Sequence, residues 1–220
     1  GTAQQCRRET RRQVELTNKQ IKKLENGREY RAMAIRARAL EEDGSMIVEG
    51  YAATFNQPYL LYDGRSCRVM ESIADTAFDD CDMSDVIMQY DHEGRVFARN
   101  KNGTMALQTD AVGLKVTADL SGTEIGRQLY QEIKGGYTDK MSFSFVVEED
   151  KRETSVEGET ETITRTITKI SKLYDVSAVS LPANDMTSIS ARRFSDGVIG
   201  EIKAERLERA KKKLKLLLEV

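Results

Sequence analysis

The chain has 220 residues, of which 39% are hydrophobic and 32% are charged, and its net charge is −2 at pH 7. This size and composition predict one folded domain with appendages and exclude a generically disordered chain. No stretch reaches the roughly 18 apolar residues of a membrane-spanning helix, and the N-terminus has no apolar signal region. We therefore expect neither secretion nor a membrane partner.

The first predicted element is a basic helix over residues 2–26, which has few β-branched residues and no proline and stops at Asn26-Gly27. Basic side chains can contact nucleic acid. This segment has no aromatic residue on which a base could stack, so we do not expect a nucleic-acid partner. The charges are interpreted as a solvated helix face.

A two-residue hydrophobic period begins at Tyr30 and predicts strands over 30–39 and 46–52. The turn between them contains Asp43-Gly44, a strong hairpin signal. Further apolar or alternating runs predict short strands over 86–90, 96–99, 105–109, 113–120, 140–147, 162–170 and 173–181. The fold class is therefore predicted to be α+β, mainly β.

Helical patterns are confined to a few later segments. Residues 73–82 suit a short helix, and in 123–134 apolar residues recur at every fourth position until a glycine pair ends the pattern. Residues 200–218 predict a last amphipathic helix. The acidic segment 148–161 is predicted to be a mobile loop or the tip of a hairpin.

The three cysteines, Cys6, Cys67 and Cys81, show no CxxC spacing, and the chain has one histidine. This inventory predicts no zinc site. The thiols are expected to be reduced, which fits an intracellular setting.

His92 is that only histidine, and it follows the predicted strand 86–90. A serine nucleophile at neutral pH needs a nearby base with a pKa near 7, which histidine usually supplies. If the chain is a serine hydrolase that uses imidazole, its base is therefore His92. The alternative is that His92 is an ordinary surface or turn residue.

The candidate nucleophile lies in strand 140–147, where Ser142 and Ser144 face away from Met141, Phe143 and Phe145. The serine face is either a packing surface of small residues or the support of a reactive hydroxyl.

Asp175 is the first candidate for a group that orients the imidazole, because acids are rare among apolar strand residues. It could instead face outward at a sheet edge. Asp91 is the weaker candidate, since neighbours on an extended segment point to opposite sides.

Five segments occur in an order that is typical of one protein family. They are 48–56 (VEGYAATFN), Asp91-His92 with Gly94-Arg95, Gly113-Leu114, Met141-Ser142-Phe143 and 175–184 (DVSAVSLPAN). Together they resemble the prohead (capsid maturation) serine proteases of HK97-like tailed phages, over about residues 30–192. That family is related in fold to the herpesvirus assemblins.

The resemblance implies a small bent β-barrel with peripheral helices, to which the predicted terminal helices are added. It implies Ser142 as nucleophile and His92 as general base. Asp175 stands where the family commonly has glutamate, and Ser144 stands where it often has glycine. Backbone amides near the nucleophile would form the oxyanion hole. No cofactor and no metal are implied.

The function implied is that of a serine endopeptidase inside the immature capsid, or prohead, in the host cytoplasm. Its substrate would be the scaffold segment of the major capsid protein, and it would cleave itself. The alternative is a non-catalytic capsid assembly protein that binds scaffold through the same fold. The expected organisation is a basic helical extension (1–28), a protease domain (29–195) and an amphipathic helix (196–220). The narrow apolar stripes of the end helices predict a homo-oligomer.

Overall fold

The computed structural model describes residues 27–33, 38–40, 46–63, 67–158 and 160–179, with four more positions at 204, 207, 208 and 211. The predicted helix 2–26 and most of the predicted helix 200–218 lie outside the described residues. The four described positions near the C-terminus are helical. No helix among the described residues is long and apolar enough to cross a bilayer.

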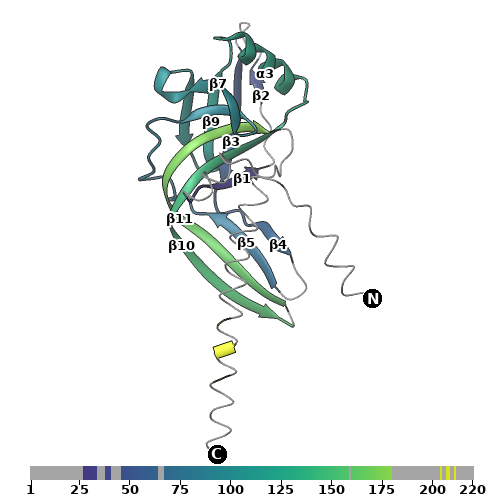
Figure 1. The fold of residues 1–220 in the computed structure, drawn as a ribbon, viewed down its shortest axis with the longest axis vertical. Helices are drawn as coiled ribbons and strands as arrows, with labels where there is room; N and C mark the ends of the chain where they lie inside the picture. Colours follow the sequence, from purple (N-terminus) through teal and green to yellow (C-terminus); the bar gives the residue numbers. More distant parts are fainter. Residues whose placement is uncertain are drawn as a thin grey trace, which may run out of the picture.

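Two β-sheets form the body of the described structure (Figure 1). The first sheet has the order β1 (Glu29–Met33), β10 (Lys140–Glu157), β11 (Thr160–Val179), β5 (Cys67–Ile73) and β4 (Tyr59–Asp63), and β6 (Ile87–Tyr90) pairs with both β11 and β7 (Glu93–Arg99). The second has the order β2 (Arg38–Leu40), β3 (Ile47–Thr54), β9 (Gly113–Asp119) and β8 (Met105–Thr109). The prediction of a mainly β chain is confirmed. The described strands do not close into a barrel, so the expected bent barrel is not confirmed.

The predicted hairpin near the N-terminus is only partly as expected. β2 and β3 pair antiparallel, with Leu40 opposite Ile47, as the Asp-Gly signal predicted. Residues 30–39, however, do not form one strand of that hairpin. β1 pairs instead with β10 in the first sheet, and Ala32 lies opposite Ser142. One short stretch of sequence therefore contributes to both sheets.

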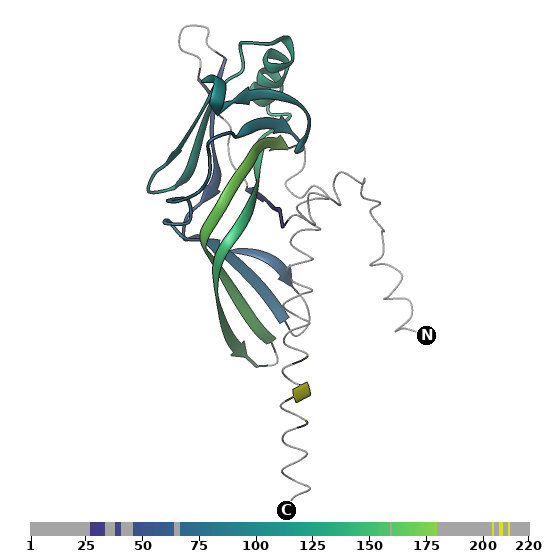
Figure 2. The same cartoon turned by 60° about the vertical axis from the view of Figure 1, so that its left-hand side comes forward.

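The longest element is the hairpin of β10 and β11, which have 18 and 20 residues and run side by side through Figures 1 and 2. Segment 148–161, predicted to be a mobile loop or the tip of a hairpin, is the end of this hairpin. The strands remain paired as far as Glu157 opposite Thr160, so only the alternative of a mobile loop is wrong. The two strands predicted over 162–181 are one strand. Alternating threonine and isoleucine in β11 favour extended structure, and the acidic partner strand keeps an exposed face.

The prediction of a helix over 73–82 is also wrong. Ile73 ends β5, and the next residues form turns. Backbone groups of this segment bond to β11: the Ala74 amide donates to the Ile167 carbonyl at 2.9 Å, and the Ala77 carbonyl accepts from the Ile170 amide at 2.9 Å. Long-range pairing thus overrides the local helical pattern.

The hydrophobic core lies where the two sheets pack, with β3 against β1 and β10. Met141, Phe143 and Phe145 all face it, and the last two rings stack with centroids 4.6 Å apart. Each buried side chain of this size contributes about 1.5–3 kcal/mol. This packing fixes β10, and with it the serine-bearing face of the same strand.

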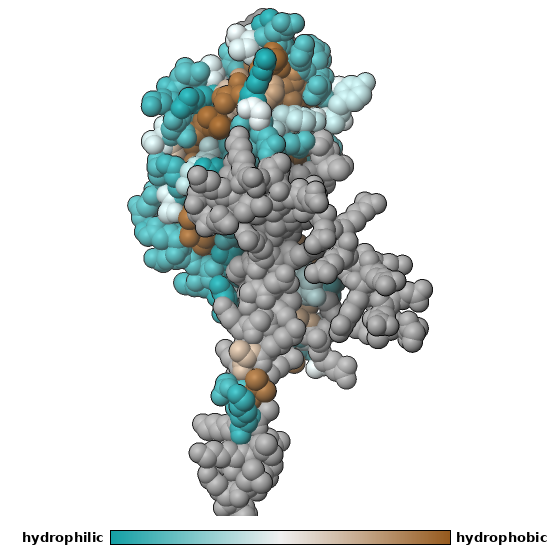
Figure 3. Space-filling view, in the orientation of Figure 1, coloured by the Kyte–Doolittle hydropathy of each residue, from teal (hydrophilic) through white to brown (hydrophobic). Residues whose placement is uncertain are grey.

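The predicted helix 123–134 is confirmed as α3 (Glu124–Lys134), and a short 3-10 turn, η2 (Asn100–Asn102), follows β7. The Thr123 hydroxyl accepts from the Gly126 amide at 3.0 Å and so caps the first turn of α3. Hydrophilic side chains dominate the described surface in Figure 3, and scattered apolar side chains interrupt them. β4 and β5 were not identified from the sequence.

Candidate active site

His92 lies in the two-residue turn that joins β6 to β7. Asp91 and His92 have φ angles of 48° and 61°, and Tyr90 pairs with Glu93 across the turn. Both central residues of such a turn need positive φ, a conformation that Asp and His tolerate better than most residues. The Asp91 amide donates to the Ala178 carbonyl at 3.0 Å and ties the turn to β11. The imidazole is therefore held next to the strands that carry the other candidates.

Ser142 and Asp175 come from the paired strands β10 and β11. Ser142 lies opposite Ser177, and Ser144 lies opposite Asp175. Because side chains alternate along a strand, these four side chains share one face, while Phe143 and Val176 occupy the core face.

The structure brings Asp175, His92 and Ser142 together in one hydrogen-bonded chain. Asp175 Oδ1 lies 2.5 Å from His92 Nδ1, and His92 Nε2 lies 2.6 Å from Ser142 Oγ. The carboxylate accepts from Nδ1–H, which leaves Nε2 to take the serine proton. This is the arrangement in which imidazole acts as a general base toward a hydroxyl. The three residues are buried, and Ser142 has 0% of its surface exposed.

The Asp175 carboxylate is held in its charged form. Burial acts to raise its pKa, but the nearby His92 and hydrogen bonds from His92, Ser144 and Ser177 outweigh it, so the pKa of Asp175 lies below its usual value. A buried carboxylate with this pKa can steady a positive imidazole next to it.

Ser142 and Ser144 of β10 make different contacts. Ser142 Oγ contacts His92, whereas Ser144 Oγ donates to Asp175 Oδ2. The geometry therefore favours Ser142 over Ser144 as the hydroxyl that the imidazole can activate. Asp175 does not face outward at a sheet edge. It is buried, and its carboxylate lies at hydrogen-bonding distance from His92.

Two contacts from β1 were not identified from the sequence. Ser142 Oγ donates to the Arg31 carbonyl at 2.8 Å, and the Tyr30 ring lies edge-on to the His92 ring with centroids 4.9 Å apart. The pairing of β1 with β10 joins residues about 110 positions apart. The hydrophobic period that begins at Tyr30 predicted a strand here, but it did not indicate that this strand pairs with β10.

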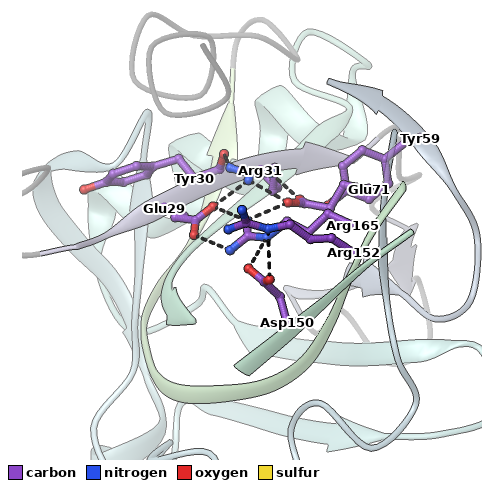
Figure 4. A network of polar contacts seen from close by, with 8 residues as sticks. All are labelled: Glu29, Tyr30, Arg31, Tyr59, Glu71, Asp150, Arg152 and Arg165. Atoms are coloured by element: carbon purple, nitrogen blue, oxygen red, sulfur yellow. Dashed lines mark hydrogen bonds and ion pairs between the residues drawn. The ribbon is translucent and has the colours of Figure 1, made fainter. Parts of the chain in front are cut away.

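Arg31 also anchors β1 to the rest of the sheet through a buried ionic network (Figure 4). Its guanidinium donates to Glu71 Oε1 at 2.5 Å and to Glu71 Oε2 at 2.9 Å, and it forms an ion pair with Glu29 at 2.6 Å. Arg165 donates to the same two glutamates. Burial acts to lower the pKa of Arg31, but the Glu71 and Glu29 charges outweigh it and hold this pKa well above its usual value. The network therefore fixes the strand whose carbonyl contacts Ser142.

We expect Glu71→Gln to destabilise the protein by about 3 kcal/mol, because it removes the more deeply buried of the two carboxylates that the guanidiniums of Arg31 and Arg165 share. Urea unfolding followed by circular dichroism measures the loss. Asp63→Asn, on the edge strand β4, is the matched control. It breaks the ion pair of Asp63 with Arg68 on β5, in which both side chains are about half exposed. Such a pair contributes about 0–1 kcal/mol. Equal losses in the two variants would contradict the anchoring role.

Among the described residues, no group of three or more His, Cys, Asp or Glu side chains is arranged to hold a metal ion. The sequence profile of the caudovirus prohead serine proteases matches residues 33–199. No curated protein and no solved structure gives a significant match.

Proposed function

The chain belongs to the caudovirus prohead serine protease family, and from that membership we propose that it is a serine endopeptidase that uses Ser142, His92 and Asp175. Membership gives it the general role of a capsid-maturation protease. The single observation that supports these three residues is the chain of hydrogen bonds from the Asp175 carboxylate through the imidazole to the Ser142 hydroxyl.

In the proposed reaction, Ser142 Oγ attacks the scissile carbonyl carbon while His92 Nε2 takes the serine proton. Asp175 steadies the resulting imidazolium through Nδ1–H. His92 then passes the proton to the leaving amine, and water hydrolyses the acyl-enzyme with His92 acting again as base. Backbone amides would stabilise the oxyanion, a contribution of roughly 3–4 kcal/mol for each donor.

The Arg31 carbonyl is a second acceptor for the Ser142 hydroxyl, beside His92 Nε2. Ser142 carries one hydroxyl proton and has two acceptors, the Arg31 carbonyl and His92 Nε2. When both imidazole nitrogens carry protons, Nε2–H donates to Ser142 Oγ and the hydroxyl donates to Arg31. When the imidazole is neutral, the hydroxyl can donate to Nε2. The Arg31 carbonyl thus holds the nucleophile in place while the base is protonated.

The proposed substrates are the scaffold segment of the capsid protein and the chain itself, inside the prohead. The alternative is a non-catalytic capsid assembly protein on the same fold. One observation favours this alternative: Ser142 has no exposed surface, so a peptide must gain access through a rearrangement.

Incubation of the purified chain with capsid protein that carries its scaffold segment separates the two functions. A peptidase yields defined fragments of the capsid protein or of itself, and it yields none after Ser142→Ala. An assembly protein binds the capsid protein and leaves both chains intact, with or without the substitution.

We also propose that the protein self-associates through its end segments. Leu207, a described position of the C-terminal segment, is 56% exposed, and the sequence around it is rich in leucine. Soluble monomers seldom expose a contiguous apolar patch. Sedimentation of the Ser142→Ala protein across a micromolar range should show a mass that rises with concentration. A monomer at all concentrations, unchanged by removal of residues 196–220, would exclude this proposal.

A further inference from the structure

We propose that Ser144 is a positioning residue: its hydroxyl holds the Asp175 carboxylate in the orientation that His92 requires. This inference rests on the proposed peptidase function, in which Asp175 orients the base. Ser144 would therefore act through Asp175, and neither as the nucleophile nor as a residue that only fills space.

The position of Ser144 follows from the strand register. Ser144 and Asp175 are directly opposite each other in the antiparallel pair of β10 and β11. Such partners have Cβ atoms about 4.5–5.5 Å apart, which is close enough for short side chains to bond directly. Ser144 Oγ donates to Asp175 Oδ2. The ladder is regular from Lys140 to this pair, and a register shift follows immediately after Ser144.

The hydrogen bonds on Asp175 divide between its two oxygens. Oδ1 accepts from His92 Nδ1 at 2.5 Å and from Ser177 Oγ at 2.9 Å, and Oδ2 accepts from Ser144 Oγ. Among the described residues, Ser144 is the side chain that donates to Oδ2. The bond between Cβ and the carboxylate of an aspartate rotates over a broad range of angles. A donor on Oδ2 therefore restricts this rotation and keeps Oδ1 directed at Nδ1.

Burial increases the effect of this contact. Ser144 is 0% exposed and Asp175 is 2% exposed. Solvent has little access to replace a lost donor, and an unsatisfied buried acceptor is costly when it is charged. Ser144 also uses its one hydroxyl proton on the carboxylate, which is why it is not available to the imidazole.

Ser144→Ala should lower kcat about 10- to 100-fold and leave KM unchanged, because a hydrogen bond to a charged group has roughly this effect on an equilibrium. Proton NMR gives a second readout that does not depend on turnover. His92 is the only histidine, so the far-downfield signal of its Nδ1–H needs no further assignment. This signal should shift and broaden in the variant. Ser72→Ala, which removes another buried hydroxyl of the same sheet, should leave both readouts unchanged.

Ser144→Cys separates positioning from packing, because its side chain fills nearly the same space but is a weak donor. If Ser144 only fills space, the cysteine variant recovers wild-type kcat and the wild-type signal, and the proposal is overturned. If Ser144 positions Asp175, the cysteine variant remains impaired in both. A wild-type signal in Ser144→Ala would likewise overturn it. The Nδ1–H signal reports on positioning even in a protein without peptidase activity. An inactive wild-type protein would therefore contradict the proposed function, whereas an unchanged signal in Ser144→Ala would contradict the positioning role.

Discussion

Ser142→Ala is expected to abolish turnover, with a loss of about 10⁴–10⁶ in rate and no change in fold. The substitution removes the hydroxyl oxygen that lies 2.6 Å from His92 Nε2 and that we propose as the nucleophile. What remains is the stabilisation that substrate binding and the oxyanion hole provide. The rate of fragment formation, measured by mass spectrometry at matched protein concentrations, gives the effect.

Ser144→Ala is the internal comparison for this prediction, since it removes a hydroxyl two residues along the same strand. Its expected loss is about 10- to 100-fold, because Ser144 contacts the carboxylate and not the imidazole. A larger loss for Ser144→Ala than for Ser142→Ala would mean that the roles of the two serines are reversed.

Asp175→Asn is expected to lower turnover about 10²–10⁴-fold while the protein remains folded. The carboxylate accepts from His92 Nδ1–H and so favours the tautomer in which Nε2, which faces Ser142, carries no proton. An amide can donate to Nδ1 instead, which favours the tautomer in which Nε2 carries the proton and cannot accept the serine proton. Single-turnover kinetics on a capsid peptide would measure the loss in the chemical step.

Asp79→Asn controls for the loss of one negative charge, because Asp79 is exposed. It should retain wild-type turnover. If Asp175→Asn also retains it, another group orients His92. If Asp175→Asn unfolds, the loss of activity reports on stability and not on the tautomer, so urea unfolding of both variants must accompany the kinetics.

The candidate site could be predicted from the sequence because each part of it had a local signal. A single histidine left one candidate for an imidazole base. The alternation of β10 separated Ser142 and Ser144 from the core residues, and the family resemblance implied Ser142 as the nucleophile. Asp175 stood out as an acid in an apolar strand. The contacts of Ser142 with Arg31 and of Asp175 with Ser144 had no such signal. They depend on the register between strands, which a single sequence does not reveal.

The fold was predicted where local pattern and long-range pairing agree, as in α3 and in the pair of β2 and β3. Errors arose where pairing decides the structure. Segment 148–161 has the composition of a loop, and of its two predicted alternatives the mobile loop is wrong, because the segment pairs with β11 up to the tip of the hairpin. Segment 73–82 has a helical pattern, yet its backbone bonds to β11. Both errors involve the long hairpin, whose length no short window of sequence indicates.

The central claim is that Ser142 is the nucleophile served by His92, and covalent labelling tests it most directly. A serine-reactive phosphonate is incubated with the wild-type protein, and the labelled residue is identified by mass spectrometry of the peptides. The account predicts one label, on Ser142, with labelling strongly reduced in an otherwise identical protein that carries His92→Ala. A label on Ser144, or no label on a protein that cleaves its substrate, would contradict it.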